Sequence, residues 1–296
     1  MHAPLRISRR MAPTVFITGA SSGIGHSSAM LLAEKGFLVF AGVRRPEDAA
    51  RLERQGRGRV FAIHADVTDE TSIRAAVGQV SGRVKGHGLD GLVNNAGIGI
   101  AGPIEHMPMD VLRQQFDVNV FGQVAVTQAF LPLIRQARGR IVNMGSVGAH
   151  IAIPFGGALC ASKAAFRSLN DALRLELRPF GIFVSMIEPG SIHTPAVGKT
   201  LGDVDGTISA LPPEGAARYA DTLRRFMERA QEREEQGSSP DVVAKAVHHA
   251  LTAKQPHARY PVGKDARLLV TMPRVLSDGM LDRIRYRLFG LPTSAT

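Results

Sequence analysis

The stretch VFITGASSGIG, residues 15–25, decides the fold of this chain. It begins as a short apolar run typical of a buried strand and ends in a glycine-rich turn, after which a helical pattern begins. Glycine permits a tight turn and a close approach of the backbone to a ligand, and the amides of a first helical turn favour an anionic group. We therefore expect Gly19, Gly23 and Gly25 to surround the pyrophosphate of a dinucleotide cofactor.

Short apolar runs and helical segments alternate over the first two thirds of the chain. The runs expected to be strands are residues 14–18, 37–42, 59–64, 89–95, 139–146 and 182–190. The segments expected to be helices are residues 24–35, 47–55, 69–86, 108–137 and 158–179. Strands that alternate with helices predict one doubly wound α/β domain, in which a parallel sheet is covered by helices on both faces.

The pattern is looser after residue 190. We expect a mobile loop, two helices, a short strand and a final helix at 195–213, 214–236, 241–254, 258–263 and 272–290. The last of these is either a helix packed on the domain or a basic amphipathic surface that touches a membrane or a partner. The expected organisation is a flexible tail (1–12), a catalytic domain (13–263) whose lid is 195–236, and a helical extension (264–296).

Composition excludes several classes of protein. The 296 residues carry a net charge of +10, but the arginines and lysines are scattered, so no nucleic-acid partner is expected. Cys160 is the only cysteine, which excludes an intrachain disulfide and a cysteine-based metal cluster, and no metal site is expected. The opening segment lacks the apolar core of a secretory signal, and no run approaches the ~20 apolar residues of a membrane span. We expect a cytoplasmic protein without stable membrane insertion.

The end of the second expected strand bears on the choice of cofactor. A fold that prefers NAD would place an acid there to bind the ribose 2′-hydroxyl, but this chain has Val43 followed by Arg44 and Arg45. Two guanidinium groups suit a 2′-phosphate, so NADP(H) is the expected cofactor. The alternative is that both arginines are solvated at the start of a loop.

Seven motifs together resemble the short-chain dehydrogenase/reductase family over nearly the whole chain. They are TGASSGIG (18–25), ADVTD (65–69), NNAG (94–97), Asn119 in DVNVFG, Ser146 in NMGSVGA, SKAA (162–165) and PGSIHTP (189–195). The segments FAGVRR and CASK are most similar to the branch of retinol and steroid dehydrogenases, which implies an apolar alcohol or carbonyl substrate. The resemblance also implies a Rossmann fold and a homodimer or homotetramer formed through helices 108–137 and 158–179.

The resemblance implies which residues contact each part of the cofactor. It implies that Asp66 and Val67 lie at the adenine, NNAG beside the ribose, Lys163 at the nicotinamide ribose, and Ile192 and Thr194 near the carboxamide. The full set of expected contacts is Gly19, Ser21, Ser22, Gly23, Ile24, Gly25, Arg44, Arg45, Asp66, Val67, Asn95, Ala96, Gly97, Lys163, Pro189, Ile192 and Thr194.

The family's catalytic unit of Asn, Ser, Tyr and Lys is incomplete here. Asn119, Ser146 and Lys163 are present, but Leu159 stands four residues before Lys163, where the family has the tyrosine that donates a proton to the carbonyl oxygen. Residues i and i+4 share a face of a helix, so Leu159 is expected to face the site, where it cannot act as an acid. A general acid contributes about 10²–10⁴ in rate, so this leucine is a serious lesion for ordinary ketone reduction.

Other groups are candidates to replace the missing acid. Cys160 is rotated by about 100° around the helix from Leu159 and is expected to face elsewhere. His150 and His193 are expected in loops near the mouth of the site, and Ser146 is expected to donate a hydrogen bond to a carbonyl. Two interpretations follow: an NADP(H)-dependent oxidoreductase with an atypical proton donor, or a cofactor-binding protein without dehydrogenase turnover.

Overall fold

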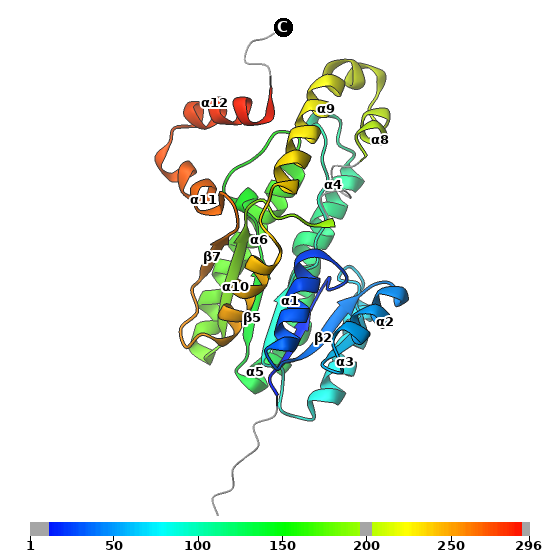
Figure 1. Ribbon diagram of the computed structural model, residues 1–296, viewed down its shortest axis with the longest axis vertical. Coiled ribbons are helices and arrows are strands. Elements are labelled where there is room, and N and C mark those ends of the chain that lie inside the picture. Colours follow the sequence, from blue (N-terminus) through cyan, green and yellow to red (C-terminus); the bar gives the residue numbers. More distant parts are fainter. Residues whose placement is uncertain (1–11, 196–202, 292–296) are drawn as a thin grey trace, which may run out of the picture.

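A computed structural model describes residues 12–195 and 203–291 of the chain (Figure 1). Its strands form one sheet in the order β3-β2-β1-β4-β5-β6-β7, and every neighbouring pair is parallel. They are β1 (Thr14–Ile17), β2 (Leu38–Val43), β3 (Val60–His64), β4 (Gly91–Asn94), β5 (Arg140–Met144), β6 (Phe183–Pro189) and β7 (Arg259–Val262). The expected doubly wound parallel sheet is confirmed, and its order reverses between β1 and β4.

The helices follow the expected alternation through the first six strands. They are α1 (Gly23–Glu34), α2 (Pro46–Gln55), α3 (Glu70–Val84), α4 (Met109–Phe116), α5 (Gly122–Ala137) and α6 (Gly157–Leu177). The later helices are α8 (Val204–Ser209), α9 (Pro213–Glu235), α10 (Asp241–Thr252), α11 (Ala266–Val275) and α12 (Asp278–Phe289). None of the helices in the described ranges is long and apolar enough to cross a lipid bilayer.

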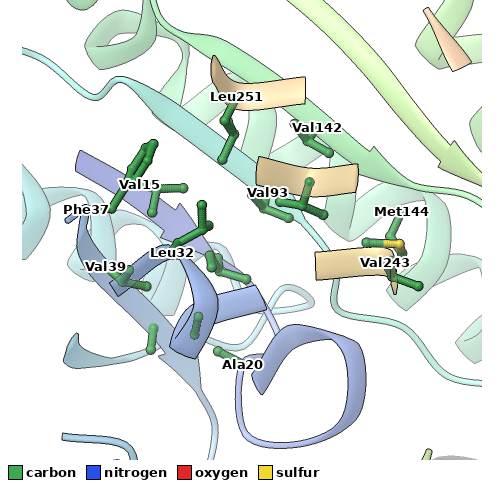
Figure 2. Packing of buried hydrophobic residues seen from close by; sticks show 14 of the residues in the cluster. Val15, Ala20, Leu32, Phe37, Val39, Val93, Val142, Met144, Val243 and Leu251 are labelled. Carbon is green, nitrogen blue, oxygen red and sulfur yellow. The ribbon is translucent and has the colours of Figure 1, made fainter. Parts of the chain in front are cut away.

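Helices cover both faces of the sheet because alternate residues of each strand point in opposite directions. On one face Leu32 of α1 and Val243 and Leu251 of α10 join the strand residues Val15 and Val93 in a single buried cluster. Figure 2 shows these side chains converging between the two helices and the sheet. This packing holds α1, and with it the glycine-rich turn, against the centre of the sheet.

The opposite face is covered by α3, α5 and α6. Phe16 of β1 and Phe130 of α5 are fully buried there, and their rings stack with centroids 4.4 Å apart. An aromatic pair of this kind adds to the energy of apolar burial. The β1–α5 contact therefore anchors the segment that carries Asn119.

Two expectations for the second half of the chain are wrong in part. Residues 204–209 were expected in a loop but form α8, because the Asp203 side chain accepts a hydrogen bond from Gly206 N (2.8 Å) and caps the helix. Residues 196–202, which belong to the same expected loop, lie outside the described residues.

The single helix expected over 272–290 is two helices, α11 and α12. Pro273 removes an amide donor from the last turn of α11, and Leu276 is extended (φ −105°, ψ 144°). The break allows Leu276 to join Met272 and Leu281 in a small apolar cluster with Ile151, which follows the Ser146 segment.

The ring pair of β1 and α5 gives a direct test of this core. We expect Phe130→Ala to lower the free energy of unfolding by about 3–5 kcal/mol, since it removes a buried ring and leaves a cavity. Phe121→Ala, whose ring is 63% exposed, is the matched control and should change it by less than about 0.5 kcal/mol. Urea unfolding followed by circular dichroism measures both, and equal losses would contradict the assigned packing.

Candidate active site

The glycine-rich turn joins β1 to α1 at the point where the strand order reverses. Gly19 and Gly23 have positive φ angles of 64° and 56°, which favour glycine. A Cβ atom on Gly25 would lie only 2.3 Å from the carbonyl oxygen of Gly19, so the turn folds back tightly on the start of α1. Ile24 packs against the core beneath it.

The N-terminus of α1 can accept an anionic group. Ser22 occupies the N-cap position but makes no side-chain capping bond, and the first turn contains no acidic residue. The amides of that turn and the positive end of the helix dipole are therefore not neutralised by the protein's own side chains. The residues present fit the pyrophosphate of a dinucleotide.

Thr18 ties this turn to the segment after β4. Its Oγ1 accepts hydrogen bonds from Asn95 N and Ala96 N, both at 2.9 Å. In return, Asn95 Nδ2 donates to Thr18 O (2.9 Å) and Gly19 O (3.0 Å). The backbone of Asn95, Ala96 and Gly97 is thus fixed beside the glycine-rich turn, across the crevice where dinucleotides bind in such sheets.

The two arginines after β2 are not equivalent. Arg45 donates from Nε to Asp48 Oδ2 (3.0 Å) and lies 3.6 Å from Glu47, and these contacts, led by the Asp48 hydrogen bond, raise its pKa. Arg44 is exposed, and its charge helps to lower the pKa of Asp66. Arg45 is therefore engaged by Asp48, whereas the charge of Arg44 acts on Asp66.

Asp66 and Val67 lie beyond the end of β3. Asp66 Oδ1 accepts from Thr68 N (2.9 Å) and Thr68 Oγ1 (2.7 Å). Burial alone would raise the pKa of Asp66, but these hydrogen bonds outweigh it and hold the pKa below its usual range. Val67 is buried, with its carbonyl oxygen close to Gly122 at the start of α5.

Arg51 contacts the glycine-rich turn, which the sequence did not predict. Its Nη2 donates to Ser21 O in the glycine-rich turn (2.6 Å) and to Asp48 Oδ1 (2.9 Å). Spacing of three residues in an expected helix indicates an ion pair between Asp48 and Arg51. The contact with Ser21 depends on how α2 packs against the turn, which no local pattern reveals.

Asn119 lies in a π-helical turn, Asp117–Phe121, between α4 and α5. A π turn within a long helix frequently marks a functional site. Asn119 is fully buried: its Oδ1 accepts from Ile98 N (2.9 Å), and its Nδ2 donates to Ile98 O (3.0 Å) and Ser162 Oγ (3.1 Å). The segment 108–137, expected as one helix, is interrupted here.

The structure brings Lys163 next to Asn119. A Cβ atom built on Gly97 would lie 3.2 Å from Asn119 Oδ1 and 3.8 Å from Lys163 Nζ. Lys163 Nζ donates to Met144 O (2.8 Å) at the end of β5, and burial lowers the pKa of Lys163 to about 8. Ser146 follows two residues later, and its Oγ accepts from Gly148 N (3.0 Å).

Leu159 and Cys160 lie on different sides of α6. Leu159 is half-buried, one helical turn before Lys163. Cys160 is buried under the turn Val147–Ala149, where its Sγ contacts Ile151 O at 3.8 Å, and burial raises the pKa of the thiol. A buried thiol of raised pKa is a poor proton donor to a ligand in the crevice.

His150, a candidate to replace the missing acid, has both of its ring nitrogens engaged. The ring is buried, with Nδ1 2.9 Å from Arg167 Nη1 and Nε2 2.6 Å from Glu188 Oε1. Because a guanidinium only donates, Nδ1 must accept and Nε2 must donate to Glu188. Glu188 is fully buried and also accepts from Arg259 Nη1 (3.0 Å), so the histidine is part of a buried ionic network. The side chain of His193 is exposed.

The segment expected beside the carboxamide begins at Pro189, the last residue of β6. Ile192 is buried and its amide donates to Glu234 Oε2 of α9 (3.1 Å). Burial raises the pKa of Glu234, although the Ile192 amide and Ser191 act in the opposite direction. Thr194 approaches the glycine-rich turn, since its Cβ would lie 3.3 Å from a Cβ on Gly23. The contact between Glu234 and Ile192 is the second one that the local sequence did not reveal.

Three phenylalanine rings form an apolar cluster between the segment before α6 and the helices α9 and α12. Phe155, four residues before Leu159, has a positive φ of 56° and packs against Phe226 of α9, with ring centroids 5.4 Å apart. Phe226 in turn contacts Phe289 of α12 (5.1 Å). A positive φ at a bulky residue is strained and clusters at functional sites. No group of three or more potential metal ligands occurs in the described ranges.

Comparisons with known proteins point to the same family as this arrangement of residues. A model of the short chain dehydrogenase family matches residues 13–204, and the chain belongs to that family of oxidoreductases, whose fold binds a nicotinamide cofactor. Human retinol dehydrogenase 5 is 38% identical over 278 residues, covering 91% of this chain and 86% of that protein. The NADPH-dependent 3-dehydrocapnine reductase of Ornithobacterium rhinotracheale is 34% identical over 276 residues, covering 92% and 95%.

A solved structure agrees with the same family. A short-chain dehydrogenase from Streptomyces avermitilis has a TM-score of 0.73 at 29% identity, covering 95% of this chain and 96% of its own. The resemblance to the retinol dehydrogenase branch, drawn from FAGVRR and CASK, is confirmed by the curated relatives.

The buried amine of Lys163 predicts a pH dependence of stability. Its pKa of about 8 lies below the value of about 10.4 in an unfolded chain, so between these values the unfolded state binds more protons. This group's contribution to the free energy of unfolding therefore rises with pH across that window, by up to about 3 kcal/mol. Urea unfolding of Lys163→Met from about pH 7 to 10 should lack this rise. The exposed Lys254→Met is the control, and identical profiles for both variants would contradict it.

Proposed function

We propose that this protein is an NADP(H)-dependent oxidoreductase that interconverts an apolar alcohol and its carbonyl, or reduces a related conjugated carbonyl. One observation carries the proposal: Asn119, Gly97 and Lys163 meet at the carboxyl end of the sheet, and Leu159 lies one helical turn before Lys163. Phe155, four residues before Leu159, packs on Phe226 and adds an aromatic wall. Polar groups at this edge suit a nicotinamide ribose, and an aromatic wall suits an apolar substrate. The test is whether NADPH absorbance falls when carbonyl compounds are added to the pure protein.

The proposed cofactor contacts follow the geometry described above. The first-turn amides of α1 would bind the pyrophosphate, Asp66 and Val67 would flank the adenine, and Lys163 would bind the nicotinamide ribose. Arg44 would bind a 2′-phosphate. The NADPH dependence in the name of the Ornithobacterium relative supports this choice.

The bound cofactor would supply or accept a hydride, and the chain's own residues would orient the reactants. The Ser146 hydroxyl oxygen accepts from Gly148 N, which leaves its hydrogen to donate to a carbonyl oxygen. The Lys163 ammonium holds a proton at Nζ and exchanges it near neutral pH because its pKa is about 8. Leu159 neither gives nor takes a proton, so water or the substrate itself would complete the transfer.

We propose that the segment 195–236 forms the lid of the substrate pocket. Ile208 and Leu211 at α8, and Phe226 in α9, belong to one apolar cluster with Phe155. Leu201, also expected to line the pocket, lies outside the described residues. Closure of such a lid would exclude water from the hydride transfer.

A second candidate function is cofactor binding without dehydrogenase turnover. The observation that favours it is the state of the neighbouring groups: Leu159 is apolar, the Cys160 thiol is buried, and both nitrogens of His150 are used. The protein would then act as a regulatory binder or as a non-redox catalyst in the same pocket.

We also propose a cytoplasmic location and a homodimer or homotetramer formed through α4–α5 and α6. A groove of about 200 Å³ between α5 and α6, lined by Leu131, Phe166 and Leu169, supports an interface there. Exposed Leu175 extends the apolar surface of α6.

The unequal arginines give a test of cofactor choice. We expect Arg44→Ala to weaken NADPH binding by about tenfold or more while leaving NADH binding unchanged, because a charge-assisted contact with the 2′-phosphate is lost. Arg45→Ala is the matched control and should have a smaller effect, since Asp48 already engages Arg45. Dissociation constants from titration of cofactor fluorescence measure both, and equal affinities for NADPH and NADH in the unmodified protein would contradict the assignment.

The position of Leu159 gives the second test. We expect Leu159→Tyr to raise NADPH-dependent carbonyl reduction by about 10²-fold or more, because it supplies a general acid one helical turn from Lys163. Leu159→Phe is the control, since it adds the ring without the hydroxyl and should give no gain. Lys163→Ala in the tyrosine background should abolish the gain, because the phenol would lose the neighbour that lowers its pKa.

Two other outcomes have distinct meanings. If the unmodified protein already reduces its substrate well and Leu159→Tyr slows it, another group supplies the proton and the leucine is an adaptation. If neither protein turns over any carbonyl although both bind NADPH, the second candidate function is the correct one.

A further inference from the structure

The amine of Lys163 differs from the other lysine amines of the described ranges. Its Nζ donates one hydrogen bond, to Met144 O (2.8 Å), although an ammonium group has three donors. No charged side chain of the described residues acts on it, because burial is the only cause of its lowered pKa. The other lysines in those ranges are all exposed: Lys35, Lys85, Lys245, Lys254 and Lys264.

The surroundings of this amine combine free space with apolar side chains. Gly97 has no side chain, and a Cβ atom there would lie 3.8 Å from Lys163 Nζ, so the glycine leaves room beside the amine. Leu159 is half-buried one helical turn before Lys163, on the same side of α6. Phe155, four residues earlier, packs on Phe226 of α9. An apolar molecule therefore has both a wall to lie against and an amine to meet.

The protonation of the amine decides what it can do to such a molecule. A lysine attacks a carbonyl carbon only as the free amine, and burial in an apolar site favours that form. Because the pKa of Lys163 is about 8, its free amine at pH 7 is about 200 times as abundant as that of a lysine with the ordinary pKa of about 10.4. Desolvated lysines of this kind form imines with carbonyl compounds.

We propose that the cofactor-free protein binds apolar aldehydes covalently, as an imine of Lys163. An aldehyde is the class of carbonyl compound that fits a partly enclosed amine, because its carbonyl carbon carries a hydrogen on one side. A ketone has carbon on both sides and hinders the approach. The apolar chain of the aldehyde would lie along Leu159 and the ring pair of Phe155 and Phe226.

The step needs no oxidant, reductant or cofactor. The nitrogen lone pair forms a bond to the carbonyl carbon, the π pair of the C=O bond moves to oxygen, and a proton passes from nitrogen to that oxygen. The resulting hydroxyl takes a proton from solvent and leaves as water while the C=N bond forms, and the nitrogen returns a proton to solvent. The Ser146 hydroxyl, two residues after Met144, would donate a hydrogen bond to the carbonyl oxygen during the attack.

The relation of this imine to the redox reaction rests on the proposed function. There Lys163 binds the nicotinamide ribose, so a bound cofactor would cover the amine. Covalent binding of an aldehyde and hydride transfer would then alternate with the occupancy of the cofactor site. Imine formation itself needs neither cofactor nor turnover, so it can be tested separately.

The experiment is reductive trapping of the full, cofactor-free chain with octanal and cyanoborohydride near pH 7. Cyanoborohydride converts the imine to a stable octyl amine, and mass spectrometry of peptides locates it. We expect at least about tenfold more label on Lys163 than on the exposed Lys254, because its free amine is more abundant. Propanal should label Lys163 at least about tenfold less than octanal, because it buries fewer methylene groups. The ketone 2-octanone should give little label.

Substitutions at Leu159 give a matched pair that keeps Lys163. Leu159→Glu places a carboxylate one helical turn before the amine, where the ion pair keeps the amine protonated. Leu159→Gln has the same shape without the charge. We expect at least about tenfold less label on Lys163 in the glutamate variant than in the glutamine variant, since a rise of one unit in pKa lowers the free amine tenfold. Lys163→Met should lose the label, and Lys254→Met should keep it.

A protection experiment separates this inference from the proposed function. Saturating NADP⁺, which cannot reduce the aldehyde, should suppress the label on Lys163 and leave that on Lys254 unchanged. If Lys163 is labelled but NADP⁺ binds without protecting it, the imine stands and the proposed cofactor contact of Lys163 is wrong.

Three results would overturn the imine: label spread evenly over Lys163 and the exposed lysines, equal label in the Leu159→Glu and Leu159→Gln variants, or as much label on Lys163 from propanal as from octanal.

Discussion

The site depends on the hydrogen bonds that the hydroxyl of Thr18 accepts. It lies at the end of β1 and accepts the amides of Asn95 and Ala96 at the end of β4, so it bridges the two strands between which the sheet order reverses. The glycine-rich turn, the start of α1 and Gly97 are all positioned from this point. Through Gly97 the same bridge reaches Asn119 and Lys163, which lie on two helices far apart in sequence.

A second constraint acts at the other end of the crevice. Glu188, the residue before Pro189, is fully buried between His150 and Arg259, and Arg259 also pairs with Asp171 of α6. Removing one member of such a network would leave a buried charge without its partner, which is costly. The network therefore holds β6, β7, α6 and the Ser146 segment in one arrangement. A histidine used in this way gains a structural role and loses the freedom to act as an acid.

Most of the fold could be predicted because its signals are local. The glycine spacing at 19, 23 and 25, and the alternation of apolar runs with helical segments, need only neighbouring residues. The position of Leu159 beside Lys163 also follows from helical spacing. The contacts Arg51–Ser21, Glu234–Ile192 and His150–Glu188 join residues 30, 42 and 38 positions apart, and they depend on packing between elements. The break at Leu276 did have a local signal, Pro273 in the last turn of α11, which the prediction of one helix over 272–290 overlooked.

The central place of β1 has a consequence for synthesis on the ribosome. Strands β1, β2 and β3 can pair as soon as His64 has emerged, but β4, the other neighbour of β1, begins only at Gly91. At about 5–20 residues per second, the buried strand TVFI would present an unpaired edge for a few seconds. An edge of that kind pairs readily with other chains. Chaperone demand during translation would therefore be greatest while α3 is being made.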